Sequence, residues 1–289
     1  MNNQTRDAAT GDWRGWAHRP DGARLAIQVT GRRTAPALLL LQGQANSHGW
    51  WDRLRGDLSR DSMTITFDYR GTGSTELHEA TYAEGAPPWS TALFAEDAAA
   101  VLTAVGRTRA DVYATSMGGR VAQELAIAHP EIIGRLVLAC TSPGGRRASE
   151  RDATVRRDLA APDPDARLRT MVDLFYSPSW VAAYGGYEGV PRDLLGDPSM
   201  TPEARRRHLA VSSGHDAADR LSGITAPTLV LHGAEDQMTP AVNAAVIADL
   251  IPGAELELFP GGRHGFFDEL SAEVTPRVAR FLAGENPRR

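Results

Sequence analysis

Residues 112–120 read Val-Tyr-Ala-Thr-Ser-Met-Gly-Gly-Arg, and the rest of the chain is organised around this stretch. An apolar run ends here, a serine lies between small residues, and a helical pattern begins at once. This spacing is that of a nucleophile elbow, a tight turn between a strand and a helix that exposes a serine hydroxyl. Large side chains at Ala114, where glycine is usual, and at Gly118 would collide as the chain reverses. The pattern also fits a Ser116 that only caps the helix, so other segments must decide.

Short apolar runs alternate with helical patterns on both sides of this turn. A strand buried on both faces of a parallel sheet has such a continuous apolar run. We expect strands at 37–41, 63–67, 111–115, 135–141, 227–231 and 255–259, and helices at 47–58, 90–105, 117–128 and 240–250, with a last amphipathic helix after 270. An antiparallel hairpin is expected at 16–31, where apolar residues alternate after a Pro-Asp-Gly turn. This alternation predicts an α/β fold with a mostly parallel sheet.

The alternation is interrupted after Cys140. Residues 142–219 are rich in Arg, Asp, Ala and Pro and show helical patterns near 149–160, 165–176 and 202–212, without a run typical of a buried strand. Such a segment is too long for one structureless loop. We therefore expect an α/β core formed by residues 12–141 and 221–286, a helical cap at 142–220 and a disordered N-terminus at 1–11.

Length and charge exclude several classes of protein. With 289 residues, 42% of them hydrophobic, the chain can form a large core. A net charge of −5 without a long basic run gives no electrostatic attraction to nucleic acid or to an anionic membrane. The polar N-terminus lacks the apolar segment of a signal peptide, and runs such as 37–41 are too short to span a bilayer. We expect a cytoplasmic protein whose partner is a small molecule, as a monomer or a homo-oligomer.

Cysteine and lysine usage narrows the chemistry further. The single cysteine, Cys140, excludes an intramolecular disulfide and a cysteine-rich zinc site, and its apolar surroundings predict a small buried residue. The chain contains no lysine, which excludes a Walker-type phosphate loop and pyridoxal chemistry that depends on a lysine amine. We expect neither a cofactor nor a metal.

Two loops after later strands supply the partners that a reactive serine needs. A serine hydroxyl is a weak nucleophile and requires a base that is itself oriented by a carboxylate. Asp236 lies three residues after Gly233, and His264 lies among glycines after the last predicted strand. Catalytic groups gather at the carboxyl ends of parallel strands, and the chain order Ser, Asp, His is that of elbow-type triads. Ser116, Asp236 and His264 are therefore the candidate catalytic residues, with Glu235 as an alternative to Asp236.

Together these segments resemble the α/β-hydrolase superfamily over nearly the whole chain. The resemblance rests on residues 116–126, 129–131 and 135–138, on Asp68-Tyr69-Arg70-Gly71-Thr72-Gly73-Ser74, and on the loops at 233–236 and 262–264. The elbow segment is most similar to enol-lactonases and small esterases. The resemblance implies a mostly parallel sheet of about eight strands, flanked by helices and covered by a helical cap.

The resemblance also implies a role for each candidate. Ser116 would be the nucleophile, His264 the general base and then acid, and Asp236 the residue that fixes the imidazole tautomer. The oxyanion hole would be formed by the backbone N–H groups of Gln44 and Met117.

The chain departs from the family just before one of these donors. Gln42-Gly43 stands where the family usually has His-Gly. A backbone donor does not depend on that side chain. The departure therefore bears on how the loop is supported and on whether the Gln44 amide helps to bind substrate.

Several other side chains are considered as substrate contacts or as further functional histidines. The candidate substrate contacts are Gln42, Trp50, Phe175 and Trp180. Of Trp50 and Trp51, one is expected in the core and the other at the pocket. Aromatic residues of the cap more often pack inside the cap than contact substrate. His129 and His232 are expected at the ends of a helix and a strand, and His18, His78, His208 and His215 on the surface.

We expect a serine hydrolase that cleaves an ester or lactone of a small to medium, largely apolar substrate through an acyl-enzyme. Other chemistry on the same triad is an alternative: C–C bond hydrolysis, perhydrolysis, or a methylesterase or cyclase step in secondary metabolism. An epoxide hydrolase or haloalkane dehalogenase is disfavoured, because these need a carboxylate in place of Ser116. A homologue that binds a ligand without turnover is a further alternative.

Overall fold

The computed structural model describes residues 5–6, 12–78, 81 and 88–285. Their strands form one sheet of nine in the order β1-β2-β3-β5-β4-β6-β7-β8-β9. The strands are β1 (Thr5–Arg6), β2 (Trp13–His18), β3 (Arg24–Thr30), β4 (Ala37–Leu41), β5 (Met63–Phe67), β6 (Ala110–Thr115), β7 (Ile133–Ala139), β8 (Thr228–Gly233) and β9 (Glu255–Phe259). From β5 onward along the sheet all neighbours are parallel, whereas β1, β2 and β3 pair antiparallel. The prediction of a mostly parallel sheet is confirmed; the eight longer strands are joined by the short β1.

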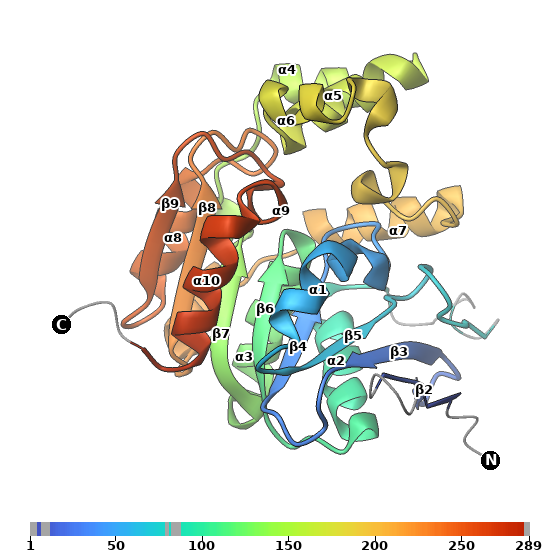
Figure 1. Ribbon diagram of the computed structural model, residues 1–289, viewed down its shortest axis with the longest axis vertical. Coiled ribbons are helices and arrows are strands. Elements are labelled where there is room, and N and C mark those ends of the chain that lie inside the picture. Colours follow the sequence, from blue (N-terminus) through green and yellow to red (C-terminus); the bar gives the residue numbers. More distant parts are fainter. Residues whose placement is uncertain (1–4, 7–11, 79–80, 82–87, 286–289) are drawn as a thin grey trace.

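Helices cover both faces of this sheet (Figure 1). The α-helices are α1 (Asp52–Leu58), α2 (Thr91–Val105), α3 (Met117–Ala128), α4 (Ala153–Leu159), α5 (Pro164–Phe175), α6 (Pro178–Ala183), α7 (Pro202–Ser213), α8 (Val242–Leu250), α9 (Phe266–Glu269) and α10 (Ser271–Leu282). Short 3-10 helices are η1 (His48–Trp51), η3 (Pro130–Ile132), η4 (Gly145–Arg147), η5 (Tyr187–Gly189), η6 (Arg192–Leu195) and η7 (Ala218–Gly223). Within the described residues, no helix is both long and apolar enough to cross a membrane.

The strand β4 shows why its run is continuously apolar. Leu39 and Leu41 face a cluster that includes side chains of α2, α3 and α8. Leu38 and Leu40 face the opposite cluster, which includes side chains of α1, α10 and the cap. Both faces of the central strand are therefore buried, so alternation with polar residues is absent.

Between β7 and β8, residues 142–220 add helices α4 to α7 and no strand of the sheet. Helices α4, α5 and α6 stack together at the top of the view in Figure 1, and α7 lies lower, beside the loops that follow β4 and β5. The short helix α6 is not among the helices expected from the sequence. Its six residues begin with Pro178, directly after the cap residue Ser177. So short a helix does not show a helical periodicity in the sequence.

The N-terminal segment differs in part from expectation. Thr5–Arg6 pair with Trp13 and Arg14 as β1 at the sheet edge, where a disordered segment was expected at 1–11. The other residues of that range lie outside the described residues.

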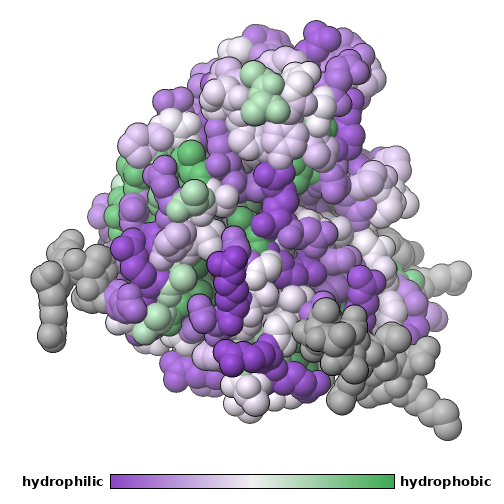
Figure 2. All heavy atoms as spheres, viewed as in Figure 1, coloured by the Kyte–Doolittle hydropathy of each residue, from purple (hydrophilic) through white to green (hydrophobic). Residues whose placement is uncertain are grey.

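The opposite edge of the sheet carries exposed apolar side chains. On β9, Leu256 and Leu258 are 41% and 46% exposed, and Figure 2 shows apolar side chains gathered on the side of the molecule where β8 and β9 lie. Arg277 of α10 pairs with the two glutamates that alternate with these leucines, Glu255 and Glu257. One face of β9 is therefore held by ion pairs, while the leucines remain partly in solvent.

Candidate active site

Ser116 occupies the turn between β6 and α3. Its backbone has φ 53° and ψ −119°, a combination that L residues rarely adopt and that marks functional turns. Its N–H donates to the Ala139 carbonyl at 2.9 Å, and its carbonyl accepts from the Thr141 hydroxyl at 2.7 Å. The Ser116 side chain makes no capping hydrogen bond to α3. The turn is thus fixed through its backbone, and the hydroxyl is available for another partner.

Gly118 lets the start of α3 approach β4. A Cβ at this position would overlap the carbonyl oxygen of Leu41 and would lie 2.6 Å from that of Gln42. Backbone atoms cannot move aside as a flexible side chain can. Glycine is therefore required here by close approach.

We expect Gly118→Ala to lower the free energy of unfolding by roughly 1–3 kcal/mol, because the added carbon overpacks this contact. Gly56→Ala is the matched control, since a Cβ there, in α1, meets nothing within 4 Å; it should raise stability by about 0.5–1 kcal/mol. Urea unfolding of both variants checks this. An unfolding free energy unchanged by Gly118→Ala would contradict the close approach.

His264 reaches Ser116 from the loop after β9. Its Nε2 lies 3.0 Å from Ser116 Oγ, and its side chain is almost fully buried. The cap holds this loop, because the N–H groups of His264 and Gly265 donate to the carbonyls of Leu174 and Phe175 at 3.1 and 2.8 Å. The imidazole is therefore positioned by the end of α5 as well as by the sheet.

Asp236 completes the relay from the loop after β8. Its Oδ2 lies 2.7 Å from His264 Nδ1, and its Oδ1 accepts from the Thr239 N–H at 2.9 Å. Burial alone would raise the pKa of the Asp236 carboxyl, but the adjacent His264 and hydrogen bonds from His232 and His264 lower it to about 2. The buried carboxylate is therefore ionised at neutral pH and can orient the imidazole.

The structure separates Asp236 from the alternative Glu235. Glu235 is exposed to solvent, whereas Asp236 is buried against His264. Of the two carboxyls, only that of Asp236 is hydrogen-bonded to this imidazole. Asp236, three residues after Gly233, is therefore the acid that faces His264.

The oxyanion loop, residues 42–46, follows β4 and lies beside the serine. An ideal Cβ built on Gly43 would sit 3.5 Å from both Ser116 Cβ and a ring carbon of Trp50. The Gln44 carbonyl accepts from Asn46 Nδ2 at 3.0 Å. Met117 is the first residue of α3, where a backbone N–H has no partner within the helix. Gly43 and Met117 therefore lie beside Ser116, and the role of the Gln44 and Met117 N–H groups as donors stays a prediction.

Gln42, which replaces the usual histidine, is fully buried. Its Nε2 donates to the Phe67 carbonyl at 2.8 Å, at the end of β5. This contact ties the oxyanion loop to the neighbouring strand. The structure gives Gln42 an anchoring role, and its predicted contact with substrate remains untested.

Two predicted substrate contacts lie near the triad and one is held elsewhere. Trp50 is buried, donates to the Thr115 hydroxyl at 3.0 Å, and meets the Phe175 ring at 6.0 Å between centroids. Phe175 lies edge to face with the His264 ring at 5.0 Å. Trp180 instead stacks between the rings of Tyr176 and Tyr184, at 3.8 and 4.1 Å. Trp50 and Phe175 thus supply apolar surface beside the triad.

Two histidines expected on the surface are buried, which corrects that prediction. His208 is 0% and His215 3% exposed. The polar residues around them in sequence indicated solvent, but Ala204, His208 and Val211 form the buried side of α7 at helical spacing. His215 is buried two residues after that helix ends. His215 bonds to the Thr91 hydroxyl and to Gln123 Oε1, on α2 and α3.

Sequence reasoning also missed His232. Its Nε2 lies 3.1 Å from Asp236 Oδ2 and 2.9 Å from the Thr239 carbonyl. Both partners accept, so this nitrogen carries the proton and donates to the triad carboxylate. A histidine four residues before the acid, at the end of the same strand, was the available signal.

Burial makes His215 an acid-sensitive part of the fold. It lowers the pKa of His215 to about 3, so the unfolded chain binds a proton that the folded chain does not at mildly acidic pH. The contribution of neutral His215 to the free energy of unfolding is fully present above the pKa of the unfolded chain, near 6.5. It is lost as the pH falls from there toward the pKa of the folded chain. We expect it to contribute about 2 kcal/mol to the loss of unfolding free energy between pH 7 and pH 5. Urea unfolding of wild type and His215→Gln at both pH values checks this, and equal losses in the two proteins would contradict it.

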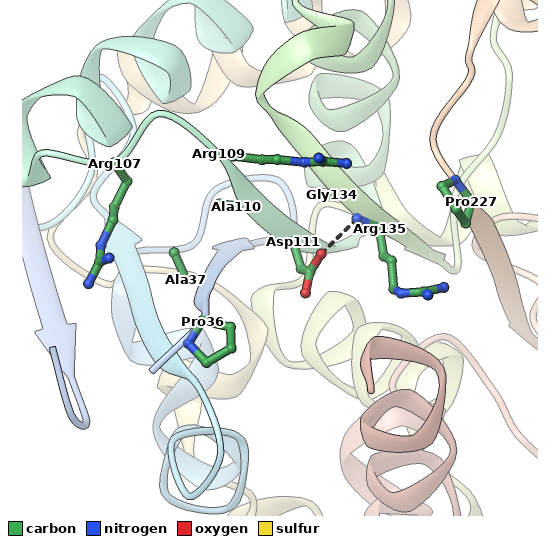
Figure 3. A pocket seen from close by; sticks show the side chains of 9 residues that line it. All are labelled: Pro36, Ala37, Arg107, Arg109, Ala110, Asp111, Gly134, Arg135 and Pro227. Atoms are coloured by element: carbon green, nitrogen blue, oxygen red, sulfur yellow. Dashed lines mark hydrogen bonds between the residues drawn. The ribbon is translucent and has the colours of Figure 1, made fainter. Parts of the chain in front are cut away.

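One cavity, of about 480 Å³, lies at the amino ends of the parallel strands, whereas the triad lies at their carboxyl ends (Figure 3). Arg107, Arg109 and Arg135 surround it, and Asp111 accepts from the Arg135 N–H at 2.7 Å. Asp111 is near the start of β6 and Ser116 follows its end, so these two residues are about 17 Å apart along the strand. This cavity is therefore separate from the triad.

A smaller cavity, of about 270 Å³, lies between the cap and the loops that carry Asp236 and His264. It is lined by Val155, Asp158, Thr170, Asp173, Leu174, Glu235, Gln237 and Arg263. Helices α4 and α5 form one wall, and the acid and histidine loops form the other. The lining is of mixed polarity and includes chain neighbours of Asp236 and His264 but no residue of the triad.

Among the described residues, no three His, Cys, Asp or Glu side chains are grouped so that they could hold a metal ion. Cys140 is buried directly after β7, and burial raises the pKa of its thiol well above the usual range. With Cys140 buried, the candidate reactive groups are the hydroxyl of Ser116, at the elbow, and the imidazole of His264 that contacts it.

This strand order, with a serine at the turn between β6 and α3 and an acid and a histidine after β8 and β9, defines a hydrolase of the α/β type. The chain belongs to the α/β-hydrolase family, whose model matches residues 36–270. The resemblance inferred from the sequence is thereby confirmed.

Known proteins of this fold resemble the chain along most of its length. RutD of Azorhizobium caulinodans, to which a carbamate hydrolase activity is ascribed, is 29% identical over 268 residues, which are 91% of this chain and 94% of RutD. A hydrolase from Pseudomonas aeruginosa superposes with a TM-score of 0.76 at 26% identity, covering 94% of this chain and 98% of its own. The enol-lactonase of Burkholderia xenovorans LB400 superposes with a TM-score of 0.73 at 20% identity, covering 90% and 97%; this last likeness is one of fold.

Proposed function

We propose that the protein is a serine hydrolase that cleaves an ester or lactone of a small to medium, largely apolar substrate. The observation that carries the proposal is the continuous relay from Ser116 Oγ through His264 to Asp236, with contacts of 3.0 and 2.7 Å. Such a relay is what activates a serine hydroxyl at neutral pH. The rings of Trp50 and Phe175 beside it favour an apolar acyl or alkoxy group.

In the proposed reaction, Ser116 Oγ attacks the substrate carbonyl while His264 Nε2 takes its proton. Asp236 stabilises the imidazolium that forms. The oxyanion of the tetrahedral intermediate accepts hydrogen bonds from the N–H groups of Gln44 and Met117. His264 then gives its proton to the leaving oxygen, and an acyl-enzyme remains.

The second half of the reaction repeats these roles with water. His264 removes a proton from a water molecule, which attacks the acyl carbonyl. The resulting tetrahedral intermediate collapses, the proton returns to Ser116, and the free acid leaves. Apart from substrate and water, both halves of this scheme use only groups of the chain itself.

A carbamate is the second candidate substrate, supported by the activity ascribed to the RutD relatives. Attack on a carbamate carbonyl uses the same nucleophile and the same oxyanion donors. The difference lies in the group beside the carbonyl, which is polar in a small carbamate. The apolar surface of Trp50 and Phe175 favours the ester or lactone.

The test is a substrate panel read by initial rates: p-nitrophenyl acetate, butyrate and octanoate, a γ-lactone and p-nitrophenyl carbamate. We expect the acyl esters and the lactone to be hydrolysed faster than the carbamate, and a fluorophosphonate probe to label Ser116. Faster carbamate hydrolysis would favour the second candidate. Folded protein that neither turns over any of these compounds nor reacts with the probe would overturn the proposal.

A further inference from the structure

We infer that His208, on the cap helix α7, is a positioning residue for the oxyanion loop and sets the rate of the chemical step by holding Ala45. The inference rests on the proposed function, because it explains how the proposed donor Gln44 is kept in place. Ala45 follows this donor directly in the chain. Part of the support of this loop comes from the cap, through His208 and Asp197.

Ala45 has a conformation that alanine does not hold by itself. Its φ is 60°, in the left-handed region where a Cβ is unfavourable and glycine is the usual residue. Such a conformation persists only when surrounding groups fix it. The oxyanion loop therefore needs an external restraint at this residue.

Both backbone polar groups of Ala45 are bound by the cap. Its N–H donates to His208 Nδ1 at 3.1 Å, and its carbonyl accepts from the Asp197 N–H at 2.6 Å. The Asp197 carboxylate in turn accepts from the Gly73 N–H. We call this set of contacts, made by His208 and Asp197, the Ala45 clamp.

The partners of His208 fix one tautomer of a neutral ring. Its Nε2 lies 2.8 Å from the Arg70 carbonyl, which can only accept, so Nε2 carries the hydrogen. Nδ1 is then unprotonated and can accept from Ala45. A second proton on the ring would set two N–H groups against each other, so the clamp requires neutral His208.

The surroundings of His208 favour that neutral ring. The side chain is fully buried, with the rings of Tyr69, Trp89 and Phe94 at 6.3, 5.9 and 5.4 Å between centroids. Burial lowers the pKa of His208 to about 4, and the cation of Arg205 acts in the same direction. The hydrogen bond to the Arg70 carbonyl and the carboxylate of Asp197 oppose this shift. The acceptor nitrogen is therefore available throughout the neutral range.

Two substitutions separate the two hydrogen bonds of the ring. His208→Asn keeps an acceptor near the position of Nδ1 and loses the donor to Arg70. His208→Gln keeps a donor near the position of Nε2 and loses the acceptor for Ala45. Both remove ring volume from the same buried site, so both should lower the melting temperature by a similar amount.

We expect His208→Gln to lower kcat on p-nitrophenyl butyrate by about tenfold to a hundredfold with KM nearly unchanged, because a displaced oxyanion donor weakens binding of the transition state only. His208→Asn should keep most of the wild-type kcat. A role in stability alone predicts equal effects of the two variants on kcat. Equal loss of kcat, or a change confined to KM, would overturn the inference.

A second substitution tests the clamp from the side of the oxyanion loop. Glycine adopts the left-handed region without a restraint, so Ala45→Gly should restore part of the kcat lost in His208→Gln. The kcat of Ala45→Gly alone is the reference against which this rescue is measured. Absence of rescue would count against the clamp.

The outcomes keep the two proposals apart. Wild-type protein that is inactive on the panel and inert to fluorophosphonate counts against the proposed function. Active wild type with an undiminished His208→Gln variant counts against the Ala45 clamp alone.

Discussion

Replacing Ser116 by alanine is expected to lower kcat on p-nitrophenyl acetate by about 10⁶-fold, the scale seen when a triad loses its nucleophile. The hydroxyl is the atom that His264 Nε2 contacts at 3.0 Å, and alanine leaves that imidazole without a group to activate. The Ser116 side chain makes no capping bond to α3. The loss of rate should therefore come without a comparable loss of stability.

The measurement pairs initial rates with thermal unfolding and with labelling by a fluorophosphonate probe. Ser213→Ala, at an exposed serine at the end of α7, is the matched control and should change none of the three. If Ser116 acted only as a helix cap, its removal would cost about 1 kcal/mol of stability and leave hydrolysis intact. Turnover preserved in Ser116→Ala would therefore refute the nucleophile assignment.

Asp236→Asn is expected to lower kcat by about 10⁴-fold with the fold retained, as found for the corresponding change in another serine triad. The Asp236 carboxylate accepts from His264 at Nδ1 and leaves Nε2 free to take the serine proton. An asparagine amide can instead donate to Nδ1 and hold the imidazole in the wrong tautomer. His232 donates to the same carboxylate oxygen, so its hydrogen bond also loses a charged acceptor.

Glu235→Gln is the matched control for this change, because it alters a neighbouring acid that is exposed. Its kcat should stay within a small factor of wild type. The comparison is made on the same ester at pH 7 and checked by thermal unfolding. A larger loss of kcat in Glu235→Gln than in Asp236→Asn would reverse the assignment of the triad acid.

The α/β core was predictable because its central strands, such as β4 and β5, are buried on both faces. Continuous apolar runs such as Ala37–Leu41 identify strands by themselves, and glycine loops mark where they end. The same logic located Ser116, Asp236 and His264, since each follows a strand in a loop of small residues. These are local signals, read within a few residues of the position concerned.

The support of the site was not predictable in this way. His208 stands among Arg205, Arg206 and Arg207, which indicates solvent, yet its partners Ala45 and Arg70 lie 163 and 138 positions away in the chain. Burial of this kind is decided by tertiary packing, for which neighbouring residues give no sign. The left-handed Ala45 was hidden for the same reason, because a glycine would have marked it.

The cap contacts bear on how such enzymes can diversify. The end of α5 binds the backbone of His264 and Gly265, and α7 with its preceding loop binds Ala45. A cap joined to both sides of the serine is not an interchangeable module. A chimaera that exchanges residues 142–220 for the cap of a relative would inherit new specificity only together with substitutes for these anchors, so the cap and the oxyanion loop should change in step during evolution.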